Sequence, residues 1–417
     1  MQEKVKEIFA TRTTCRLCGS RNIKKVLPLA PTALCDAYVS KERVSQKQDV
    51  YPLDLFLCYD CGYVHLPYVV DPEIIYRDYI YVTTSSMGLA DHFKNYAASV
   101  LDKIRPAAGG LIVDIGSNDG TLLAFFKAKG MRVLGIEPAV KIAQNASLEG
   151  IETLPNFFNT DFASDCKKKY GPAKIITVNN LLANVDDLND FANSIRNLLA
   201  DDGVLVVESS YLGDMIKNMV FDFIYHEHLS YFSVKPLMKF FKRFKMDLID
   251  VEKISTKGGS LRYYFQPQTG PRKASAAVTD IIREEEILKL DSPDTYRTFS
   301  NNINALKSGL RSVLTGLKAQ GKSIAGYGAS ATSTTLIYHF GLADMMDYIV
   351  DDNQAKYNTF SPGYHIPVVP SEEIYIRKPD YIIMLAWRYA EPIMKKHQGY
   401  IKQGGHFIIP IPGVRVI

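Results

Sequence analysis

The sequence predicts a multidomain α/β protein, with a small N-terminal domain followed by two units that each contain a doubly wound parallel sheet. Three observations predict this class. The chain has 417 residues, more than one hydrophobic core usually supports. Residues 111–208 and 323–409 alternate short apolar strands with helical segments, a pattern that builds parallel sheets covered on both faces. Ahead of both stands a segment whose cysteines occur in pairs.

Paired cysteines mark the N-terminal domain. Six cysteines occur, and two CxxCG units hold four of them: Cys15, Cys18, Cys58 and Cys61. The spacing lets the two thiolates of a pair bind the same metal ion, and two such pairs together give the tetrahedral four-sulfur site that zinc prefers. Four thiolates leave no open position, so we expect a structural ion. The alternative is four reduced cysteines with coincidental spacing. Cys35 and Cys166 stand apart, and we expect packed or surface thiols there.

The middle segment predicts a cofactor site at the ends of its strands. Residues 111–137 predict a strand, a glycine-bearing turn, a helix and a second strand that ends in Glu137. The two glycines of the turn are four positions apart and Asp114 precedes them, unlike the GxGxxG of dinucleotide enzymes. Glu137 could bind two ribose hydroxyls. The arrangement resembles the S-adenosylmethionine site of class I methyltransferases, and residues 246–265 predict the terminal hairpin of that fold. A site for NAD is the alternative.

The C-terminal segment predicts a second α/β unit. After a helix-rich stretch at 272–319, residues 323–330 predict a strand and a glycine turn that opens a helix. Free amides at a helix start bind phosphate well, so one unit could hold a methyl donor and the other a phosphate-bearing substrate. Because a lone glycine turn is weak evidence, a purely structural turn is the alternative.

The densest group of proton-transfer side chains lies at 224–232. It contains Tyr225, His226, Glu227 and His228, all residue types that enzymes use for acid–base work. Histidine has a pKa suited to a general base. His228 is expected to face the site as the base, and His226 is expected to be a buried imidazole that takes a less direct part.

Together, these motifs resemble the zinc-containing, S-adenosylmethionine-dependent sugar C-methyltransferases that act on nucleotide-linked 4-keto-deoxysugars. The resemblance covers nearly the whole chain and rests on the two CxxCG units and on residues 113–120, 225–232, 258–262, 326–329 and 361–367. It implies a zinc-binding domain at 1–72, a methyltransferase domain at 73–268 and a Rossmann-like nucleotide-sugar-binding domain at 269–417. It also implies that carbon 3 is deprotonated to an enolate, which attacks the methyl group of the donor.

The resemblance also implies roles for single residues. The general base is expected to be His228, assisted by a catalytic set of Tyr225, Glu227, Asn184 and Tyr79. The residues expected to bind S-adenosylmethionine are Asp114, Gly116, Ser117, Asn118, Gly120, Glu137, Pro138, Asn156, Phe157 and Asn180. Those expected to bind the nucleotide-linked sugar are Tyr81, His226, Gly259, Ser260, Tyr327, Ser330, Asp352, Lys356, His365 and Trp387.

Two positions depart from the family pattern. Asn184 stands where a histidine is expected. An amide can donate to a carbonyl oxygen but does not titrate near neutrality, so a different keto-sugar or methylation position could follow. Residues 331–334, Ala-Thr-Ser-Thr, stand where lysine and asparagine are expected, which puts the predicted phosphate contacts in question.

Composition narrows the classes of function. The net charge of +4 and the isoelectric point near 8.5 are too weakly basic to indicate nucleic acid. No apolar stretch is long enough to span a membrane, and the N-terminus lacks the apolar core of a signal peptide, so we expect a cytoplasmic protein.

The family resemblance also implies a monomer. The alternatives are an O- or N-methyltransferase on a nucleotide sugar, a zinc-ribbon RNA methyltransferase and a binding or scaffold protein without turnover.

Overall fold

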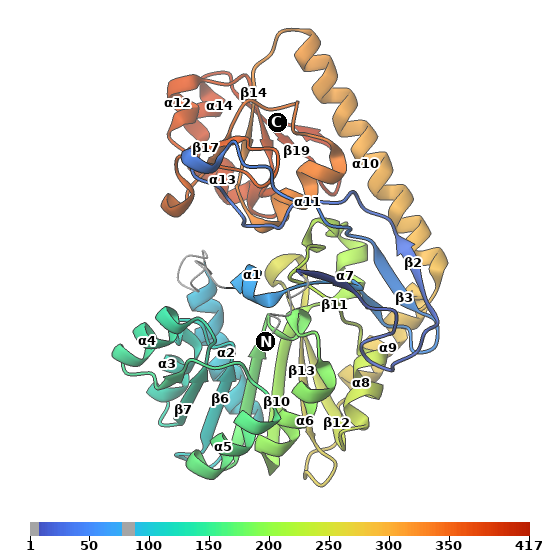
Figure 1. Cartoon of the computed structure of the whole chain (residues 1–417), viewed down its shortest axis with the longest axis vertical. Coiled ribbons are helices and arrows are strands. Elements are labelled where there is room, and N and C mark those ends of the chain that lie inside the picture. Colours follow the sequence, from blue (N-terminus) through green and yellow to red (C-terminus); the bar gives the residue numbers. More distant parts are fainter. Residues whose placement is uncertain (1–7, 77–87) are drawn as a thin grey trace, which may run out of the picture.

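Two seven-stranded sheets, a four-stranded sheet and a two-stranded ribbon form the framework of the described chain. The structure, a computed structural model, describes residues 8–76 and 88–417. In Figure 1 the first seven-stranded sheet lies at the bottom and the second at the top, with the blue N-terminal strands beside them on the right.

The first seven-stranded sheet has the order β12-β13-β10-β9-β6-β7-β8. Its strands are β6 (Leu111–Ile115), β7 (Arg132–Ile136), β8 (Thr153–Leu154), β9 (Ala173–Asn179), β10 (Leu199–Ser210), β12 (Met246–Ile254) and β13 (Ser260–Pro267). The five strands from β8 to β10 are parallel, and β13 runs antiparallel to both β10 and β12. β6 is buried along its whole length, because a parallel sheet is covered on both faces.

Helices cover both faces of this sheet. They are α2 (Leu89–Ile104), α3 (Thr121–Ala128), α4 (Val140–Leu148), α5 (Thr160–Tyr170), α6 (Leu188–Leu198), α8 (Val234–Lys242) and α9 (Ala276–Leu288). Phe93 and Phe126 bring α2 and α3 into one core, while Phe191, Phe240 and Val278 bring α6, α8 and α9 into a second core. The sheet therefore lies between two apolar layers.

The N-terminal strands form a small sheet whose last strand, β11, comes from far along the chain. Its order is β11-β4-β3-β2, and beside it β1 pairs with β5. The elements are β1 (Phe9–Thr11), β2 (Ile23–Leu27), η1 (Lys41–Arg43), β3 (Leu55–Cys58), β4 (Val64–His65), β5 (Tyr68–Val70), α1 (Pro72–Tyr76) and β11 (Ser230–Tyr231). Ser230 pairs with His65 and Tyr231 with Val64, so a segment of the central domain completes the N-terminal sheet.

The second seven-stranded sheet has the order β16-β17-β15-β14-β18-β19-β20. The strands are β14 (Ile324–Tyr327), β15 (Ile349–Asp351), β16 (Thr359–Phe360), β17 (Pro367–Pro370), β18 (Tyr381–Met384), β19 (His406–Ile409) and β20 (Arg415–Val416). Its helices are α11 (Ala331–Phe340), η6 (Gln354–Lys356), α12 (Glu373–Arg377), η7 (Trp387–Tyr389), α13 (Ala390–Lys396) and α14 (Gln398–Lys402). The central strands β17, β15, β14, β18 and β19 are parallel.

A long helix, α10 (Pro293–Ala319), connects the two halves of the molecule. Ser292 accepts a hydrogen bond from the amide of Asp294 and a proline occupies the first turn, both of which favour a helix start at this point. Helix α10 runs along one side of the structure (Figure 1). Its residues Phe299 and Ile303 enter a core that also contains Leu57 of β3, Phe221 and Ile349 of β15. The N-terminal sheet, the segment around Phe221 and the C-terminal sheet therefore share one apolar core.

Short elements gather at the carboxyl-terminal edge of the first seven-stranded sheet. They are η3 (Leu182–Asn184), α7 (Leu212–Lys217), η4 (Phe221–Phe223) and η5 (Thr256–Gly258). Ligands bind at this edge in open α/β sheets. The predicted fold class is confirmed: a small four-cysteine domain, a Rossmann-like sheet with a terminal hairpin, and a second α/β sheet.

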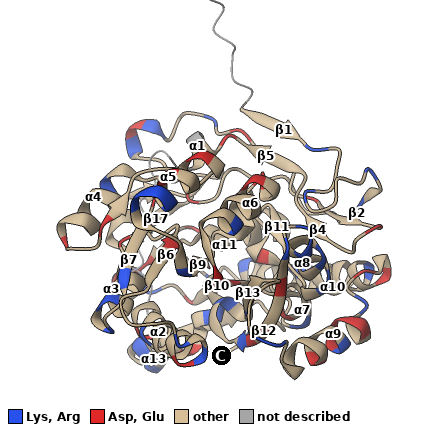
Figure 2. Cartoon of the chain, turned by 90° about the horizontal axis from the view of Figure 1, so that it is seen from below, with Lys and Arg blue, Asp and Glu red and all other residues tan. Residues whose placement is uncertain are grey.

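Charged side chains of both signs are spread over the same elements (Figure 2). In the described part of the chain, no helix is long and apolar enough to cross a membrane.

Candidate active site and zinc site

The four paired cysteines meet in one cluster. All of their sulfur atoms lie within 4.8 Å of one another, with Cys15 3.7 Å from Cys61 and Cys18 3.6 Å from Cys58. The amides of Gly19 and Gly62 donate to the carbonyls of the first cysteine of each pair, both at 2.9 Å. Both glycines have φ near +75°, a conformation that permits the tight turn. Four converging sulfurs fit a tetrahedral zinc ion and leave no ligand position for a substrate.

The glycine turn after β6 is built for close approach of a ligand to the backbone. Gly116 has φ +76° and donates its amide to the carbonyl of Ile136 at 2.8 Å. A Cβ atom at Gly116 would stand 2.9 Å from Leu181 Cδ2, too close for any larger residue without movement. Gly120, also at φ +76°, caps the start of α3. The predicted turn therefore lies at the carboxyl end of β6 and opens a helix.

Glu137 holds this turn in place from the end of β7. Its two carboxylate oxygens accept the amides of Asn118 at 3.1 Å and Ala139 at 2.9 Å. Burial raises the pKa of Glu137. The buried Asp114 of β6 accepts the Thr177 hydroxyl at 2.6 Å, and burial raises the pKa of Asp114 to about 7.

The remaining predicted cofactor residues lie around the same edge. Pro138 follows Glu137, while Asn156 and the half-exposed Phe157 follow β8. Asn180 follows β9 in a left-handed conformation at φ +55°. Ser117 is buried, and its Oγ has no hydrogen-bond partner among the described residues. An unpartnered hydroxyl at the mouth of the glycine turn fits a site that takes a polar ligand such as S-adenosylmethionine.

The Tyr225–His228 segment is a turn rather than an extended strand. The amide of His228 donates to the carbonyl of Tyr225 at 2.9 Å, and the two rings lie 4.1 Å apart between centroids. The turn brings both side chains to one side, whereas an extended segment would place positions three apart on opposite faces. Tyr225 and His228 therefore form a pair.

Hydrogen bonds define the state of His228. Its Nδ1 lies 3.1 Å from the carbonyl of Phe223, which can only accept, so Nδ1 carries the proton. Its Nε2 lies 3.1 Å from the Tyr225 hydroxyl and is left with the lone pair. Burial, and in second place the charge of Lys257, lower the pKa of His228 to about 4. The imidazole is therefore neutral and able to accept a proton near neutral pH.

The other two members of the segment face different surroundings. His226 is buried, and its Nε2 donates to the carbonyl of Pro52 at 3.1 Å, against the N-terminal domain. Glu227 accepts the Cys35 thiol at 3.3 Å, and burial raises the pKa of Glu227 to about 7. Cys35 is buried, so of the two expectations for this cysteine, a packed thiol or a surface thiol, the packed thiol holds.

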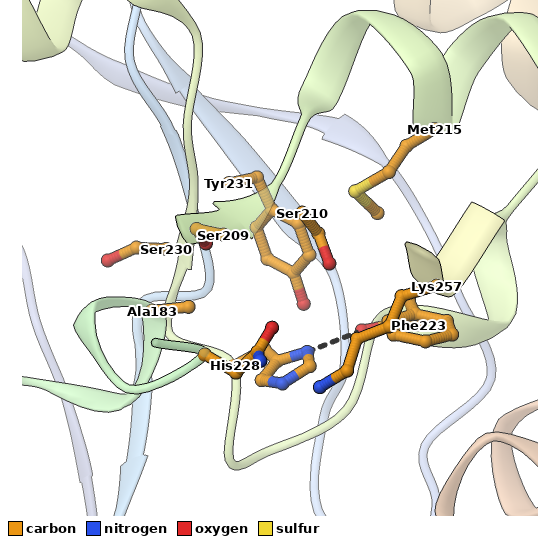
Figure 3. Close-up of a pocket in the computed structure, with 10 residues that line it drawn as sticks. Ala183, Ser209, Ser210, Met215, Phe223, His228, Ser230, Tyr231 and Lys257 are labelled. Carbon is orange, nitrogen blue, oxygen red and sulfur yellow. Dashed lines mark hydrogen bonds between the residues drawn. The ribbon is translucent and has the colours of Figure 1, made fainter. Parts of the chain in front are cut away.

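A cavity lies directly above His228 (Figure 3). It is lined by Asn180, Ala183, Ser209, Ser210, Met215, Phe223, His228, Ser230, Tyr231 and Lys257. The cavity therefore joins the end of β9, which belongs to the cofactor edge, with the proton-transfer segment. Asn184 follows Ala183 at the end of η3, and the amide of Leu229 donates to the Ala183 carbonyl at 2.7 Å. Gly259 lies between η5 and β13, and Ser260 is the first residue of β13.

The predicted nucleotide-site residues lie at the end of β14 and around it. Tyr327 donates to Asp352 at 3.1 Å and lies 3.0 Å from His397 Nε2. Ser330 precedes α11, and His365 lies in the turn before β17 at φ +53°. Tyr327, Ser330 and Asp352 are thus gathered at one edge of the second sheet.

Two other predicted substrate residues are occupied by contacts between parts of the protein. Lys356 donates to Asp36 at 2.8 Å and to the carbonyl of Ala329 at 2.5 Å. Trp387 donates its indole N–H to Asp222 at 3.0 Å. Both side chains have a structural role in the free protein. Tyr79 and Tyr81 lie outside the described residues.

Comparison with known proteins assigns this chain to a family. Family models match in three places: a zinc binding domain at 15–76, a methyltransferase domain at 90–250 and a C-methyltransferase C-terminal domain at 255–412. The C-methyltransferase NovU of Streptomyces niveus is 31% identical over 404 residues, which cover 97% of this chain and 96% of that protein. The chain belongs to the C-methyltransferase family.

Solved structures resemble part of this C-methyltransferase. Magnesium protoporphyrin IX methyltransferase from Synechocystis PCC 6803 with bound SAH is 15% identical, with a TM-score of 0.34, over 43% of this chain and 84% of that one. An S-adenosylmethionine-dependent methyltransferase from Clostridium acetobutylicum is 11% identical, with a TM-score of 0.35, over 48% of this chain and 96% of that one.

Family membership makes the protein a methyltransferase that uses S-adenosylmethionine and carries a zinc site in its N-terminal domain. Several cavity residues were missed from the sequence: Ser209, Ser210, Met215, Phe223, Tyr231 and Lys257. Lys257 carried a usable signal, since it directly precedes the Gly258-Gly259 turn of the terminal hairpin. Tyr231 lies within the 225–232 motif but was not assigned a role, whereas Ser209, Ser210, Met215 and Phe223 lie in ordinary apolar or serine-containing stretches that no motif marks.

Proposed function

We propose that this C-methyltransferase transfers a methyl group to the carbon next to the ketone of a nucleotide-linked 4-keto-deoxysugar. For a 4-ketone that carbon is C-3 or C-5, and C-3 is the position that the family resemblance implied. The observation that carries the proposal is the Tyr225–His228 pair. A neutral imidazole with a fixed tautomer lines a cavity beside the strand ends expected to hold the methyl donor.

The chemistry explains why such a pair is needed. Carbon is a poor nucleophile, and a ketone acidifies the neighbouring C–H by accepting the electron pair as an enolate. The enzyme must supply a base at that carbon and hydrogen-bond donors at the oxygen. Bound S-adenosylmethionine supplies the electrophilic methyl group. Methyl transfer to oxygen or nitrogen would need no carbanion, and a base aimed at carbon would be superfluous.

The base is the pair rather than His228 alone. In the free protein the Tyr225 hydroxyl occupies the Nε2 lone pair. The proton leaving the sugar carbon can pass to the phenol oxygen while the phenol proton moves to Nε2, or reach Nε2 directly once Tyr225 turns aside. The carbonyl of Phe223 holds the Nδ1 proton in both cases and stabilises the imidazolium that forms.

The ligands would occupy two opposed edges. Gly116, Ser117 and Glu137 would hold the methyl donor at the first sheet, and Asn184, the last residue of η3, would donate to the sugar. Tyr327, Ser330 and Asp352 would bind the nucleotide at the second sheet. The Tyr225–His228 turn lies in the segment that contacts both parts, since Thr335 of α11 donates to the carbonyl of Ile224 at 2.7 Å.

The test is incubation of the protein with S-adenosylmethionine and a panel of nucleotide-linked 4-keto-deoxysugars. Mass spectrometry should show one added methyl group on at least one member, and NMR should place it on a carbon next to the ketone. A methyl ether or methylamine product would contradict the proposal and favour O- or N-methylation. Turnover with no keto-sugar, but with another class of substrate, would also contradict it.

A further inference from the structure

One cation lines the cavity above His228 in the described part of the chain. It is Lys257, which lies in η5 between the two strands of the terminal hairpin. Figure 3 shows its amino group directed toward the His228 ring from the side opposite Ala183. No ion pair joins Lys257 to a carboxylate among residues 8–76 and 88–417. A cation held in a cavity without a protein partner is costly unless a ligand supplies negative charge.

The backbone around Lys257 is arranged to place this side chain. Lys257 has φ +57° and ψ 24°, and Gly258 and Gly259 follow at φ +84° and +125°. A Cβ atom at Gly259 would stand 2.4 Å from Asp214 Cβ, so the turn is held tightly against α7. Left-handed conformations are unfavourable for residues other than glycine, and they cluster at functional sites. A glycine here would relax the backbone but would remove the amino group.

Two of the three charged neighbours of Lys257, Glu208 and Arg388, form ion pairs with other residues, and the third, Glu227, accepts the Cys35 thiol. Glu208 of β10 binds Arg262 at 2.8 Å and His92 at 2.7 Å. Arg388 of η7 binds Asp222 at 2.9 Å. Glu208 and Arg388 therefore each have an ion-pair partner other than Lys257.

These surroundings set the protonation state of Lys257. Burial lowers its pKa to about 8, Glu208 and Glu227 oppose this shift, and Arg388 adds to it. His228 is neutral near pH 7 and adds no charge. The amino group is thus mostly an ammonium at neutral pH and loses its proton as the pH rises through about 8.

We propose that the Lys257 ammonium donates a hydrogen bond to the ketone oxygen of the sugar and stabilises the enolate as it forms. The inference rests on the proposed function and extends it to a catalytic residue. The Tyr225–His228 pair takes the proton from carbon, and the C–H electron pair becomes the new C=C bond. The carbonyl π pair moves to oxygen, where Lys257 faces it. Lys257 keeps its proton throughout, and the ketone re-forms when carbon takes the methyl group.

The test measures solvent deuterium exchange at the sugar carbon, in the presence of S-adenosylhomocysteine so that no methyl group is transferred. Three variants are compared with the wild type: Lys257→Met, Lys257→Arg and Lys245→Met. Lys245 is the matched control, because it is an exposed lysine at the same left-handed conformation, φ +56°, outside the cavity. Calorimetry with S-adenosylhomocysteine checks that each variant is folded.

We expect Lys257→Met to slow exchange about a hundredfold or more, as loss of an oxyanion donor does. Lys245→Met should exchange at the wild-type rate. Wild-type exchange should fall as the pH rises through about 8, because the ammonium is lost, and Lys257→Arg should keep its activity at higher pH. In full turnover, the loss in Lys257→Met should appear in kcat rather than in KM alone.

Three results would overturn this inference and leave the proposed function intact. They are deuterium exchange by Lys257→Met at the wild-type rate, an effect of Lys257→Met on KM but not on kcat, and a covalent adduct of Lys257 with the keto-sugar that borohydride traps. The last would show an iminium in place of a hydrogen bond. Absence of exchange by the wild type with every keto-sugar would instead overturn the proposed function, and this inference with it.

Discussion

Two hydrogen bonds on one imidazole define the chemistry of the proposed base. The Phe223 carbonyl fixes the proton on Nδ1, and the Tyr225 hydroxyl occupies Nε2. Asparagine at position 228 would keep hydrogen-bonding capacity but could not accept a proton. We expect His228→Asn to lose about a hundredfold or more in solvent deuterium exchange at the sugar carbon, while S-adenosylmethionine binding measured by calorimetry is unchanged.

The matched control is His226→Asn, two positions away. His226 is buried against Pro52 of the N-terminal domain, so its substitution should lower stability while the exchange rate of the folded enzyme is kept. If His226→Asn abolishes exchange and His228→Asn does not, the base is wrongly assigned.

Glu227 should make stability depend on pH. Its folded pKa of about 7 lies above the ordinary value of 4.5, with burial as the main cause. Below the ordinary value the carboxyl is protonated in both states and folding has no penalty. The penalty grows as the pH rises toward 7 and is complete above it. Glu227→Gln should therefore raise the free energy of unfolding by about 1–3 kcal/mol near pH 8 and by much less near pH 5.

Urea unfolding at the two pH values measures this difference. Gln keeps an oxygen that can accept the Cys35 thiol, so the variant removes only the charge. Asp114 and Glu285 also have raised pKa values, but they are common to both proteins and cancel in the comparison. A constant difference across the pH range would contradict the argument.

At the scale of elements, three parts of the protein hold the Tyr225–His228 turn. The C-terminal domain binds its N-terminal flank through Arg388, whose guanidinium contacts both oxygens of Asp222 at 2.9 Å. The central domain binds Leu229 through Ala183, and the N-terminal sheet binds Ser230. The geometry of the turn therefore depends on all three.

Arg388→Met should destabilise the protein strongly. The Asp222 side chain is fully buried, and removing its partner leaves an uncompensated charge, which costs about 3–5 kcal/mol. The double variant Asp222→Asn, Arg388→Met should recover a large part of this loss. Trp387, the only tryptophan in the chain, donates to the same carboxylate, so its fluorescence reports on this contact directly during urea unfolding. Equal stability of Arg388→Met and wild type would contradict the role of the pair.

The elements that the sequence predicted are those with local signals. The strand, glycine turn and helix of 111–126 lie next to one another in the chain, and β6 has the predicted bounds of 111–115. The pairing of β11 with β4 could not be predicted, because two residues carry no periodicity and their partners lie far away in the chain. The Gly258-Gly259 turn marks Lys257 as a residue of the terminal hairpin, but the sequence does not show which way its side chain points, and the tertiary structure is needed to place it in the cavity. The proposed roles of the individual residues stay predictions.

At the scale of the whole molecule, the zinc site is coupled to the proposed active site through a sheet. β3 ends at Cys58, β3 pairs with β4, and β4 pairs with β11, which begins two residues after His228. Zinc removal by a chelator should therefore lower turnover by about a hundredfold through misplacement of the turn, while donor binding at the first seven-stranded sheet is retained.

Metal analysis and calorimetry accompany the turnover assay, and added zinc should restore activity. Cys58→Ser should behave like the chelated enzyme. Cys166→Ser is the control, because Cys166 is buried in α5 outside the cluster. Full turnover by protein shown to be free of zinc would rule out this coupling.

The pairing of β11 with β4 also constrains how the chain can fold during synthesis and where it can be cut. Tyr63 and Ser230, which share a hydrogen bond, are 167 positions apart. During synthesis, the N-terminal strands and their cysteines are therefore complete long before β11, which pairs with β4, has been made. Until then β4 has an unpaired edge, the kind of surface that recruits neighbouring chains. A fragment cut before residue 230 keeps its metal ligands but exposes that edge. Neither half of an enzyme split before residue 230 should therefore fold correctly alone. The N-terminal half lacks β11, and the C-terminal half lacks the N-terminal sheet that holds the end of the Tyr225–His228 turn.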